Sequence, residues 1–392
     1  MSKYPTVKLG DVCIIERGGS PRPINKFITK DPNGINWIKI GDTSADSMYI
    51  TKTAEKIIPE GVLKSRQVKK GDFILSNSMS FGRPYILNID GCIHDGWLLI
   101  RDINDIFEKQ FLYYYLSSET VYANLKQMAV GGVVNNLNSN KVRSLMVPVL
   151  KKEDQVKICN KLNKITTVIQ QRKQQLSKLD ELAKSRFLEM FGQCGEDRFG
   201  WGVSKLGDYC IINPSKSTEA RLEDELEVSF CPMPYVSESG DIKTDETKLY
   251  KDVKSGFTYF AEEDVLFAKI TPCMENGKGA IARNLKNGIG FGSTEFHILR
   301  PNRNIITPEW LYVLTTFKQF RKDAEANMTG SAGQKRVPSI FLRNYKISIP
   351  PLEMQKQYVG ILEQLDKSKF RIKKSLEKLE MTYKALLQEY FG

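Results

Sequence analysis

Residues 153–192 read EDQVKICNKLNKITTVIQQRKQQLSKLDELAKSRFLEMFG, and this stretch decides the fold. It contains no proline and ends in Phe191-Gly192, where a glycine past the last apolar residue is a typical helix stop. Mostly apolar residues recur at alternating steps of four and three, which predicts one long helix with a coiled-coil seam. The predicted seam positions are Ile158, Leu162, Ile165, Ile169, Arg172, Leu176, Leu179, Ala183, Arg186 and Met190.

Residues 353–392 repeat this pattern 200 positions later and also end in Phe-Gly. Their seam positions are Tyr358, Leu362, Leu365, Lys369, Ile372, Leu376, Leu379, Tyr383, Leu386 and Tyr390. At 1.5 Å per residue each helix is roughly 55–60 Å long, more than packing on one small domain requires. We therefore predict that the helices pack on each other, antiparallel as in an isologous contact. The alternative is two unrelated amphipathic helices, each lying on its own domain.

The repeat extends beyond the helices. Lys8-Leu9-Gly10-Asp11 recurs as Lys205-Leu206-Gly207-Asp208, and single residues further along also recur at a distance near 200. Such a period duplicates a whole domain plus its helix. Between these anchors the halves differ strongly, so the sequence predicts a common frame with two divergent inserts. The expected boundaries are 1–150 and 193–352 for two similar domains, and 151–192 and 353–392 for the long helices.

Short strand-like runs fill both domains, separated by Gly, Pro, Asn and Asp. In the first domain they are Trp37-Ile38-Lys39-Ile40, Asp72-Phe73-Ile74-Leu75, Trp97-Leu98-Leu99-Ile100 and Leu145-Met146-Val147. In the second they are Val228-Ser229-Phe230, Val265-Leu266-Phe267-Ala268 and Phe296-His297-Ile298-Leu299. One helix is predicted over 108–128 and its counterpart over 308–327. Strands followed by a helix predict an α+β fold rather than βαβ winding.

Composition narrows the class of protein. The 392 residues carry 58 Lys+Arg against 46 Asp+Glu, a formal net charge of +12 that suits a polyanion such as nucleic acid. Seven scattered cysteines without a Cys-x-x-Cys pair indicate reduced structural thiols rather than a zinc ribbon or a disulfide framework. The N-terminus lacks the apolar run of a signal peptide, and no apolar stretch approaches 18 residues. We therefore expect a cytoplasmic protein without a membrane partner.

Catalytic and cofactor signatures are missing. The chain has no phosphate-binding Gly-x-x-x-x-Gly-Lys-Ser/Thr loop, no Gly-x-Gly-x-x-Gly and no Gly-x-Ser-x-Gly elbow. Asn213-Pro214-Ser215-Lys216 is not the Asn-Pro-Pro-Tyr of an adenine methyltransferase. Only His94 and His297 are present, which excludes a histidine-rich metal site, although a site of two carboxylates stays open. We predict no catalytic residue, no metal ligand and no cofactor in this chain.

Polar, glycine-rich stretches are the candidates for DNA contact, because Arg and Lys donate to guanine edges and phosphates while Asn and Gln pair with adenine. Such stretches follow strand-like runs at matching places in both halves. The alternative is that these loops are simply solvated. The candidate DNA-binding residues are Arg22, Lys39, Ser76, Asn77, Ser78, Arg83, Lys269, Thr271, Asn276, Lys278, Gln334, Lys335 and Arg336.

The anchors resemble those of a known family. Lys-Leu-Gly-Asp, Gly18-Gly19-Ser20-Pro21, Trp-Ile-Lys-Ile, and Ile349-Pro350-Pro351-Leu352 before a glutamine and a long helix are similar to the specificity subunits of type I restriction-modification systems. So is the run from Phe257-Thr258-Tyr259-Phe260 to Thr294-Glu295-Phe296-His297. The resemblance covers the whole chain, with one departure, Pro148-Val149-Leu150 in the first half.

The resemblance implies two similar target-recognition domains, joined by two long antiparallel coiled-coil helices as a pseudo-two-fold repeat. Each domain would read one part of a bipartite, asymmetric site on double-stranded DNA. The paired helices would dock two methyltransferase subunits, and restriction subunits with motor and nuclease activity would join them. S-adenosylmethionine and ATP with magnesium would belong to those partners. The alternatives are a stand-alone nuclease or methyltransferase, and a coiled-coil scaffold without a DNA role.

Overall fold

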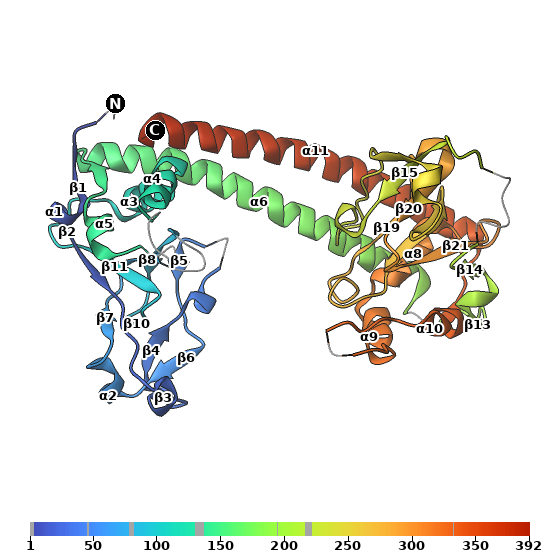
Figure 1. The fold of residues 1–392 in the computed structure, drawn as a ribbon, viewed down its shortest axis with the longest axis horizontal. Coiled ribbons are helices and arrows are strands. Elements are labelled where there is room, and N and C mark those ends of the chain that lie inside the picture. The colour runs from blue at the N-terminus through green and yellow to red at the C-terminus, as the bar shows by residue number, and fades with distance from the viewer. Residues whose placement is uncertain are drawn as a thin grey trace. The chain divides into compact units, whose positions relative to one another are not determined.

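The structure is a computed structural model that describes residues 4–44, 47–77, 82–129, 137–193, 195–215, 222–331 and 333–392. The chain divides into two compact units, one made of Met1–Lys173 with Lys373–Gly392 and the other of Gln174–Ile372. Two helices of 40 residues, α6 (Lys152–Phe191) and α11 (Leu352–Phe391), run through both units (Figure 1). Each unit therefore combines a sheet-rich part with one portion of each long helix.

The first unit holds two five-stranded sheets, ordered β2-β11-β8-β9-β5 and β3-β6-β4-β10-β7, and the pair β1-β12. Up to α6, its elements are β1 (Thr6–Lys8), α1 (Leu9–Val12), β2 (Cys13–Arg17), η1 (Ile24–Lys26), β3 (Ile28–Thr29), β4 (Ile35–Ile38), η2 (Ile40–Asp42), β5 (Tyr49–Ile50), β6 (Glu55–Ile57), α2 (Pro59–Val62), β7 (Arg66–Val68), β8 (Phe73–Ser76), β9 (Pro84–Leu87), β10 (Gly91–Ile93), β11 (Trp97–Asp102), α3 (Lys109–Leu116), α4 (Glu119–Ala129), α5 (Ser139–Arg143) and β12 (Met146–Pro148).

The second unit holds two four-stranded sheets, ordered β14-β21-β18-β19 and β16-β15-β20-β17, and the pair β13-β22. Between the long helices, the described elements are β13 (Val203–Lys205), η3 (Leu206–Asp208), β14 (Cys210–Ile212), β15 (Glu227–Cys231), η5 (Met233–Tyr235), β16 (Thr247–Leu249), α7 (Tyr250–Val253), β17 (Thr258–Ala261), β18 (Val265–Ala268), β19 (Gly279–Ile281), η6 (Lys286–Gly288), β20 (Ile289–Gly292), β21 (Phe296–Pro301), α8 (Pro308–Thr316), α9 (Lys318–Ala326), α10 (Ser339–Asn344) and β22 (Lys346–Ser348). Sheets with helices packed beside them confirm the α+β prediction.

The divergent inserts share one topology. The order β6-β4-β10-β7 in the first unit matches β16-β15-β20-β17 in the second. The central pair is parallel in both (β4 with β10, β15 with β20), and both outer pairs are antiparallel. Sequence comparison missed this likeness because main-chain hydrogen bonds define the sheet, while the side chains on it are free to differ.

The repeated Lys-Leu-Gly-Asp turns have a packing reason. Leu9 and Leu206 are fully buried, and their amides donate to the carbonyls of Leu145 at 2.7 Å and Tyr345 at 2.9 Å. The next residue in the turn is glycine because the main chain there passes close to a helix, α5 in the first unit. A Cβ on Gly10 would lie 2.7 Å from the Cβ of Arg143, closer than real Cβ atoms come.

A buried glutamine begins each long helix and fastens it to its own unit. The amide of Gln155 donates to the carbonyls of Ile106 (3.0 Å) and Leu150 (2.9 Å), and its oxygen accepts from the amide of Glu108 (2.7 Å). Gln355 makes the same three bonds, to Ile305 (2.8 Å), Pro350 (2.9 Å) and Thr307 (2.9 Å). Both side chains are completely buried. All partners are main-chain atoms, so the attachment does not depend on the neighbouring side chains.

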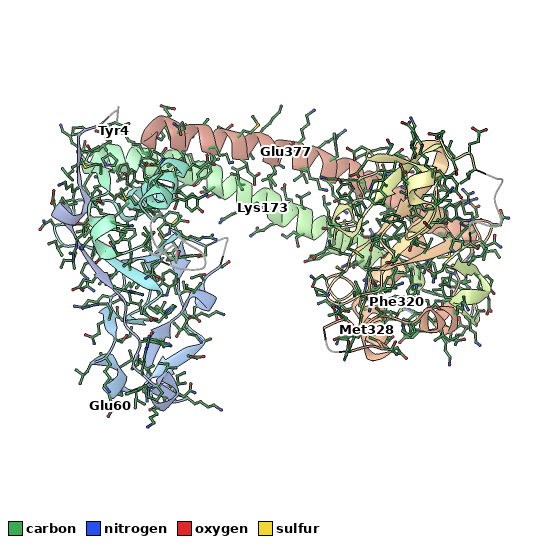
Figure 2. All side chains as sticks on the ribbon, in the orientation of Figure 1. Tyr4, Glu60, Lys173, Phe320, Met328 and Glu377 are labelled. Atoms are coloured by element: carbon green, nitrogen blue, oxygen red, sulfur yellow. The ribbon has the colours of Figure 1, made fainter. Side chains whose placement is uncertain are left out.

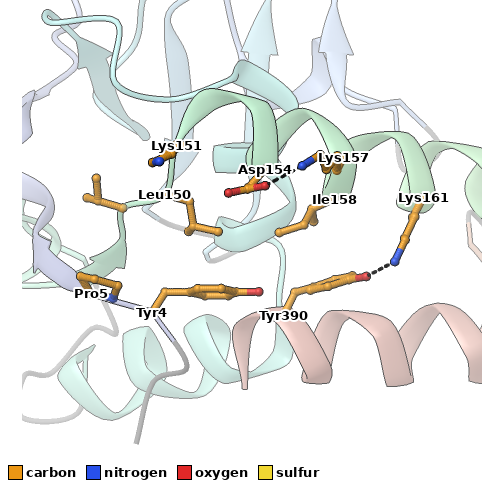
Figure 3. Close-up of a pocket in the computed structure, with 10 residues that line it drawn as sticks. Tyr4, Pro5, Leu150, Lys151, Asp154, Lys157, Ile158, Lys161 and Tyr390 are labelled. Carbon is orange, nitrogen blue, oxygen red and sulfur yellow. Dashed lines mark hydrogen bonds and ion pairs between the residues drawn. The ribbon is translucent and has the colours of Figure 1, made fainter.

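The long helices run antiparallel within each unit. In the first, Lys161 Nζ lies 3.2 Å from the Tyr390 hydroxyl (Figure 3), and Lys173 pairs with Glu380 at 3.7 Å. Rising numbers on α6 thus meet falling numbers on α11, as they also do in the second unit. There Lys369 pairs with Asp180 at 2.7 Å, and the Tyr358 hydroxyl donates to the carbonyl of Ala183 at 2.9 Å. The prediction of antiparallel packing is confirmed, and Lys369 has an acidic partner.

Three local predictions are wrong. Arg186 was placed on the seam but is exposed, and Phe187 is buried in its place with 1% exposure. The helix predicted over 108–128 is two helices, because Ser118 Oγ accepts from the amide of Val121 (3.3 Å) and starts α4 anew. The helix predicted over 308–327 likewise breaks, at Phe317, whose backbone is extended.

Leu176→Ala is expected to lower the stability of the chain by about 1–2 kcal/mol. That is less than the ~2–5 kcal/mol typical of a fully buried leucine, because Leu176 lies on the seam only half-buried. Thermal unfolding followed by circular dichroism measures the effect. Lys178→Ala, an exposed position on the same helix, is the control. Equal melting temperatures for the two variants would contradict the assigned seam.

The described cysteines are free thiols, while Cys194 lies outside the described residues. Burial raises the pKa of Cys13 and of its repeat counterpart Cys210 to about 12, as expected of structural cysteines. Among the helices in the described ranges, none is both long and apolar enough to cross a membrane.

Candidate nucleic-acid interface

Both units place polar loops at the same edge of the repeated sheet. In the first unit β2 and β8 end where β11 begins, and in the second β14 and β18 end where β21 begins, because each central strand is antiparallel to its neighbours. The β18–β19 loop, residues 269–278, and the β8–β9 loop, whose described residues are Asn77, Gly82 and Arg83, leave this edge. Most of the sequence-predicted DNA contacts lie at these two edges.

In the second unit the edge joins two loops distant in sequence. The amide of Thr271 donates to the carbonyl of Lys335 (3.1 Å), and the amide of Val337 donates to that of Lys269 (2.9 Å). The structure thus brings together Lys269, Thr271, Lys335 and Arg336, with Gln334 beside them. Gln334 and Lys335 are exposed. This pairing between the β18–β19 loop and residues 335–337 was not visible in the sequence.

Two cationic side chains at this edge, Arg336 and Lys269, have different surroundings. The Arg336 guanidinium forms two hydrogen bonds to Glu295, at 2.9 and 2.8 Å, and holds the pKa of that carboxyl below its usual range. Part of the Arg336 charge is therefore already neutralised. Lys269 is half-buried, and this burial lowers the pKa of its ammonium group. It lines a hollow of about 510 Å³. The other lining residues are Asn213, Pro214, Ser215, Phe257, Thr258, Tyr259 and Phe296.

Beside this hollow, Asn213 and His297 form a link that sequence analysis did not single out. His297 Nε2 donates to the carbonyl of Val337 at 2.7 Å, so Nδ1 is left to accept from the Asn213 amide at 3.0 Å. The Asn213 oxygen accepts from the amide of Ile298 at 3.0 Å. Burial lowers the pKa of His297, which favours the neutral ring this arrangement needs. The link joins the end of β14 and the start of β21 to Val337, which precedes α10.

The remaining candidates of the second unit lie further along the β18–β19 loop. Asn276 is exposed, while Lys278 is half-buried with its ammonium 3.4 Å from the carbonyl of Met233. Met328, labelled in Figure 2, lies next to the loop, with its sulfur 3.8 Å from the Thr271 hydroxyl.

In the first unit the edge centres on Asp95. Its carboxylate accepts from the Ser20 hydroxyl (2.9 Å) and lies 3.6 Å from the exposed Arg22. Its main-chain carbonyl accepts from Arg17 Nε (3.2 Å) and from the side-chain amide of Asn77 (3.0 Å). Arg17 and Asp95 were missed by sequence analysis, although the Gly-Gly-Ser-Pro-Arg stretch beside Arg17 pointed to this place.

The other predicted residues of the first unit are spread out. Ser76 and Asn77 are buried, so in this arrangement their side chains support the edge from within. Arg83 lies over the Tyr85 ring at 5.4 Å, and Lys39 pairs with Glu55 at 2.5 Å in the other sheet. Ser78 lies outside the described residues. In the described part of the chain, no group of three or more His, Cys, Asp and Glu gathers as metal ligands.

Two domains of one family account for the repeat. The model of the family described as "Type I restriction modification DNA specificity domain" matches residues 1–180 and 199–381. The chain belongs to this family. The specificity-domain family is thus present twice, as the resemblance of the sequence predicted.

Similar proteins in this family are named as specificity subunits of type I restriction enzymes. The chain is 46% identical over 167 residues to the Type I restriction enzyme EcoAI specificity subunit of Escherichia coli, a match covering 42% of this chain and 28% of that protein. It is 29% identical over 208 residues to the putative type I restriction enzyme MjaX specificity subunit of Methanocaldococcus jannaschii, covering 51% and 47%. The chain spans between about a quarter and a half of the length of these two relatives.

Solved structures share the fold. One, described under "Structural basis underlying complex assembly and conformational transition of the type I R-M system", has a TM-score of 0.58 at 18% identity, covering 100% of this chain and 99% of that one. The type I restriction-modification S subunit from M. genitalium has a TM-score of 0.50 at 13% identity, covering 100% and 96%. At these identities the likeness concerns the fold alone.

Proposed function

We propose that this chain is the non-catalytic DNA-recognition subunit of a type I restriction-modification complex. Each half reads one part of a bipartite, asymmetric site on double-stranded DNA. The observation that carries the proposal is the repeated sheet edge: one frame, present twice, presents two different sets of polar and basic loops. A single repeated frame gives both halves the same way of approaching DNA, and different loops give each half its own sequence.

Residues 1–150 and 193–352 are the reading domains in this proposal, and 151–192 and 353–392 are the helices between them. The paired helices dock two methyltransferase subunits, and restriction subunits complete the assembly. S-adenosylmethionine, and ATP with magnesium, bind to those partners. The complex works in the cytoplasm, where it meets DNA. Relatives named as specificity subunits support this assignment.

Methylome sequencing of a host that carries this chain and its methyltransferase partner tests the proposal. We expect methylation at one motif made of two short parts separated by a fixed spacer. Methylation without a motif, or at a single unbroken motif, would contradict it. Nuclease or methyltransferase activity of the purified chain alone, with magnesium or S-adenosylmethionine, would favour a stand-alone enzyme. Failure to retain DNA on filters at low salt would favour a scaffold.

Alanine substitution of the candidate contacts is expected to separate two kinds of residue. Loss of a phosphate-binding Lys or Arg weakens binding to all sequences alike and lowers the salt slope by about one. Loss of a base-reading side chain costs about 1–3 kcal/mol on the cognate site only. The variants that test direct contact are Arg83→Ala, Lys278→Ala, Gln334→Ala and Arg336→Ala, and Asn77→Ala, at a buried position, tests support of the edge from within.

Binding isotherms on cognate and scrambled duplexes, at two salt concentrations, make this measurement. Lys178→Ala, on the exposed face of α6, is the control for a simple loss of positive charge. Unchanged isotherms for all five variants would mean that these loops face elsewhere, and the residue assignment would be wrong.

A further inference from the structure

The β18–β19 loop is built as a fixed shape. Four of its main-chain amides donate within the loop: Met274 to the carbonyl of Ile270 (2.9 Å), Asn276 to that of Pro272 (2.9 Å), Gly277 to that of Met274 (3.0 Å) and Lys278 to that of Cys273 (3.0 Å). Met274 is fully buried, and Gly277 has a φ of +89°, a conformation that other residues rarely adopt. The loop therefore presents Thr271, Asn276 and Lys278 from a folded base.

Arg321, on α9, lies beneath this loop and is only 8% exposed. Its NH1 donates to the carbonyl of Met274 (2.8 Å), its NH2 to that of Gly277 (3.3 Å) and its Nε to that of Thr315 (2.6 Å). The guanidinium also lies over the Phe267 ring, 4.6 Å from its centroid. No carboxylate in the described ranges pairs with it.

A buried cation without a counter-ion is costly, and such a group usually pairs with an acid. Burial lowers the pKa of Arg321 to about 10, which reflects that cost. An apolar side chain would fill the same space without it. Three carbonyl dipoles offset the cost here, and two of them belong to the β18–β19 loop. The guanidinium thus donates hydrogen bonds to two loop carbonyls and fixes their positions. A carboxylate at this place could not do so, because it accepts hydrogen bonds and does not donate them.

The residue equivalent to Arg321 in the first half lies at the same point of its helix but is a tyrosine, Tyr122. Val121 and Leu125 of α4 correspond to the buried Phe320 and Ala324 of α9, so Tyr122 corresponds to Arg321. The Tyr122 ring lies 3.4 Å from where a Cβ on Gly82 would be, in the shorter β8–β9 loop. The same helix position thus meets the corresponding loop in both units.

We propose that Arg321 is a positioning residue for DNA recognition by the second half of the chain. By holding the carbonyls of Met274 and Gly277, it fixes the β18–β19 loop in the shape that reads its part of the site. This inference rests on the proposed function and adds a residue that does not itself touch DNA. It predicts that sequence preference depends on a side chain enclosed in the protein core.

Selection from a randomised duplex library tests this, using the full chain together with its methyltransferase partner. The wild type should enrich a two-part motif. Arg321→Met, which keeps length but removes every donor, should keep one part and lose at least tenfold preference within the other. Hydrogen exchange of the loop amides should quicken at least tenfold, while exchange of the β18–β21 pairs stays unchanged. Lys322→Met, an exposed change on the same helix, should alter neither.

Two further variants keep the test decisive if Arg321→Met does not fold. Gly277→Ala strains the loop from outside the core, and Arg321→Lys keeps the charge with fewer fixed donors. Both should weaken preference in the same part of the motif. Faster loop exchange with an undiminished two-part motif would overturn the proposal, because Arg321 would then serve only the fold. A wild type that enriches no motif would instead overturn the proposed function itself.

Discussion

Replacing residues 1–150 by the corresponding segment of a relative is expected to change one part of the recognised DNA sequence completely and to leave the other part intact. The polar edge around Asp95 is built entirely within this segment, and so is the β1-β12 pair that closes it. The edge around Lys269 belongs wholly to the other unit.

The junction at residue 150 tolerates the exchange for a physical reason. Gln155 lies just beyond it and holds only main-chain atoms of the exchanged segment, so a different sequence on the same backbone still satisfies it. Phe391 of α11 also packs on the rings of Phe111 and Tyr115, at 5.4 and 5.7 Å between centroids. The donor should therefore carry aromatic residues at these two places.

Methylome sequencing of hosts carrying the exchanged and the parental chain gives the readout. The reciprocal exchange of residues 193–352 is the matched control and should change only the other part of the motif. Simultaneous change of both parts in either chimera would contradict a division of recognition between the two halves.

Phe187→Ala is expected to destabilise the second unit by about 3–5 kcal/mol, the usual cost of emptying a buried phenylalanine site. Phe187 is 1% exposed and contacts the rings of Phe191, Trp310, Phe317 and Tyr358, with centroids 4.9 to 5.8 Å away. It therefore joins α6, α8 and α11 at one point.

Differential scanning calorimetry should show the melting temperature of this unit falling by roughly 6–20 °C. Arg186→Ala, one residue earlier and exposed, is the control and should change it little. This pair also decides between two seam phases, because an uninterrupted four-three pattern places Arg186 rather than Phe187 in the contact. A larger loss from Arg186→Ala would restore that pattern.

The frame of this protein could be predicted from its amino-acid sequence. Two stretches of 40 residues with matching periodicity predicted two long helices that pack antiparallel, and both are present as α6 and α11. The repeated Lys-Leu-Gly-Asp turns predicted a duplicated domain. These features could be predicted because a helix seam and a tight turn are local patterns. The residues that form them are close together in the sequence, so their periodicity alone shows which face of a helix they share.

Which residues contact one another depends on the packing of segments that are distant in the sequence. The seam moves from Arg186 to Phe187 because the end of α6 packs on Trp310 and Phe317 as well as on α11, so two surfaces rather than one select the buried face. The pairing of the β18–β19 loop with residues 335–337 joins positions 64 to 68 residues apart in the sequence. Arg321 looks in the sequence like any charge on a polar helix. Its role depends on carbonyls more than 40 positions away, and a contact between distant residues leaves no periodic trace along the chain.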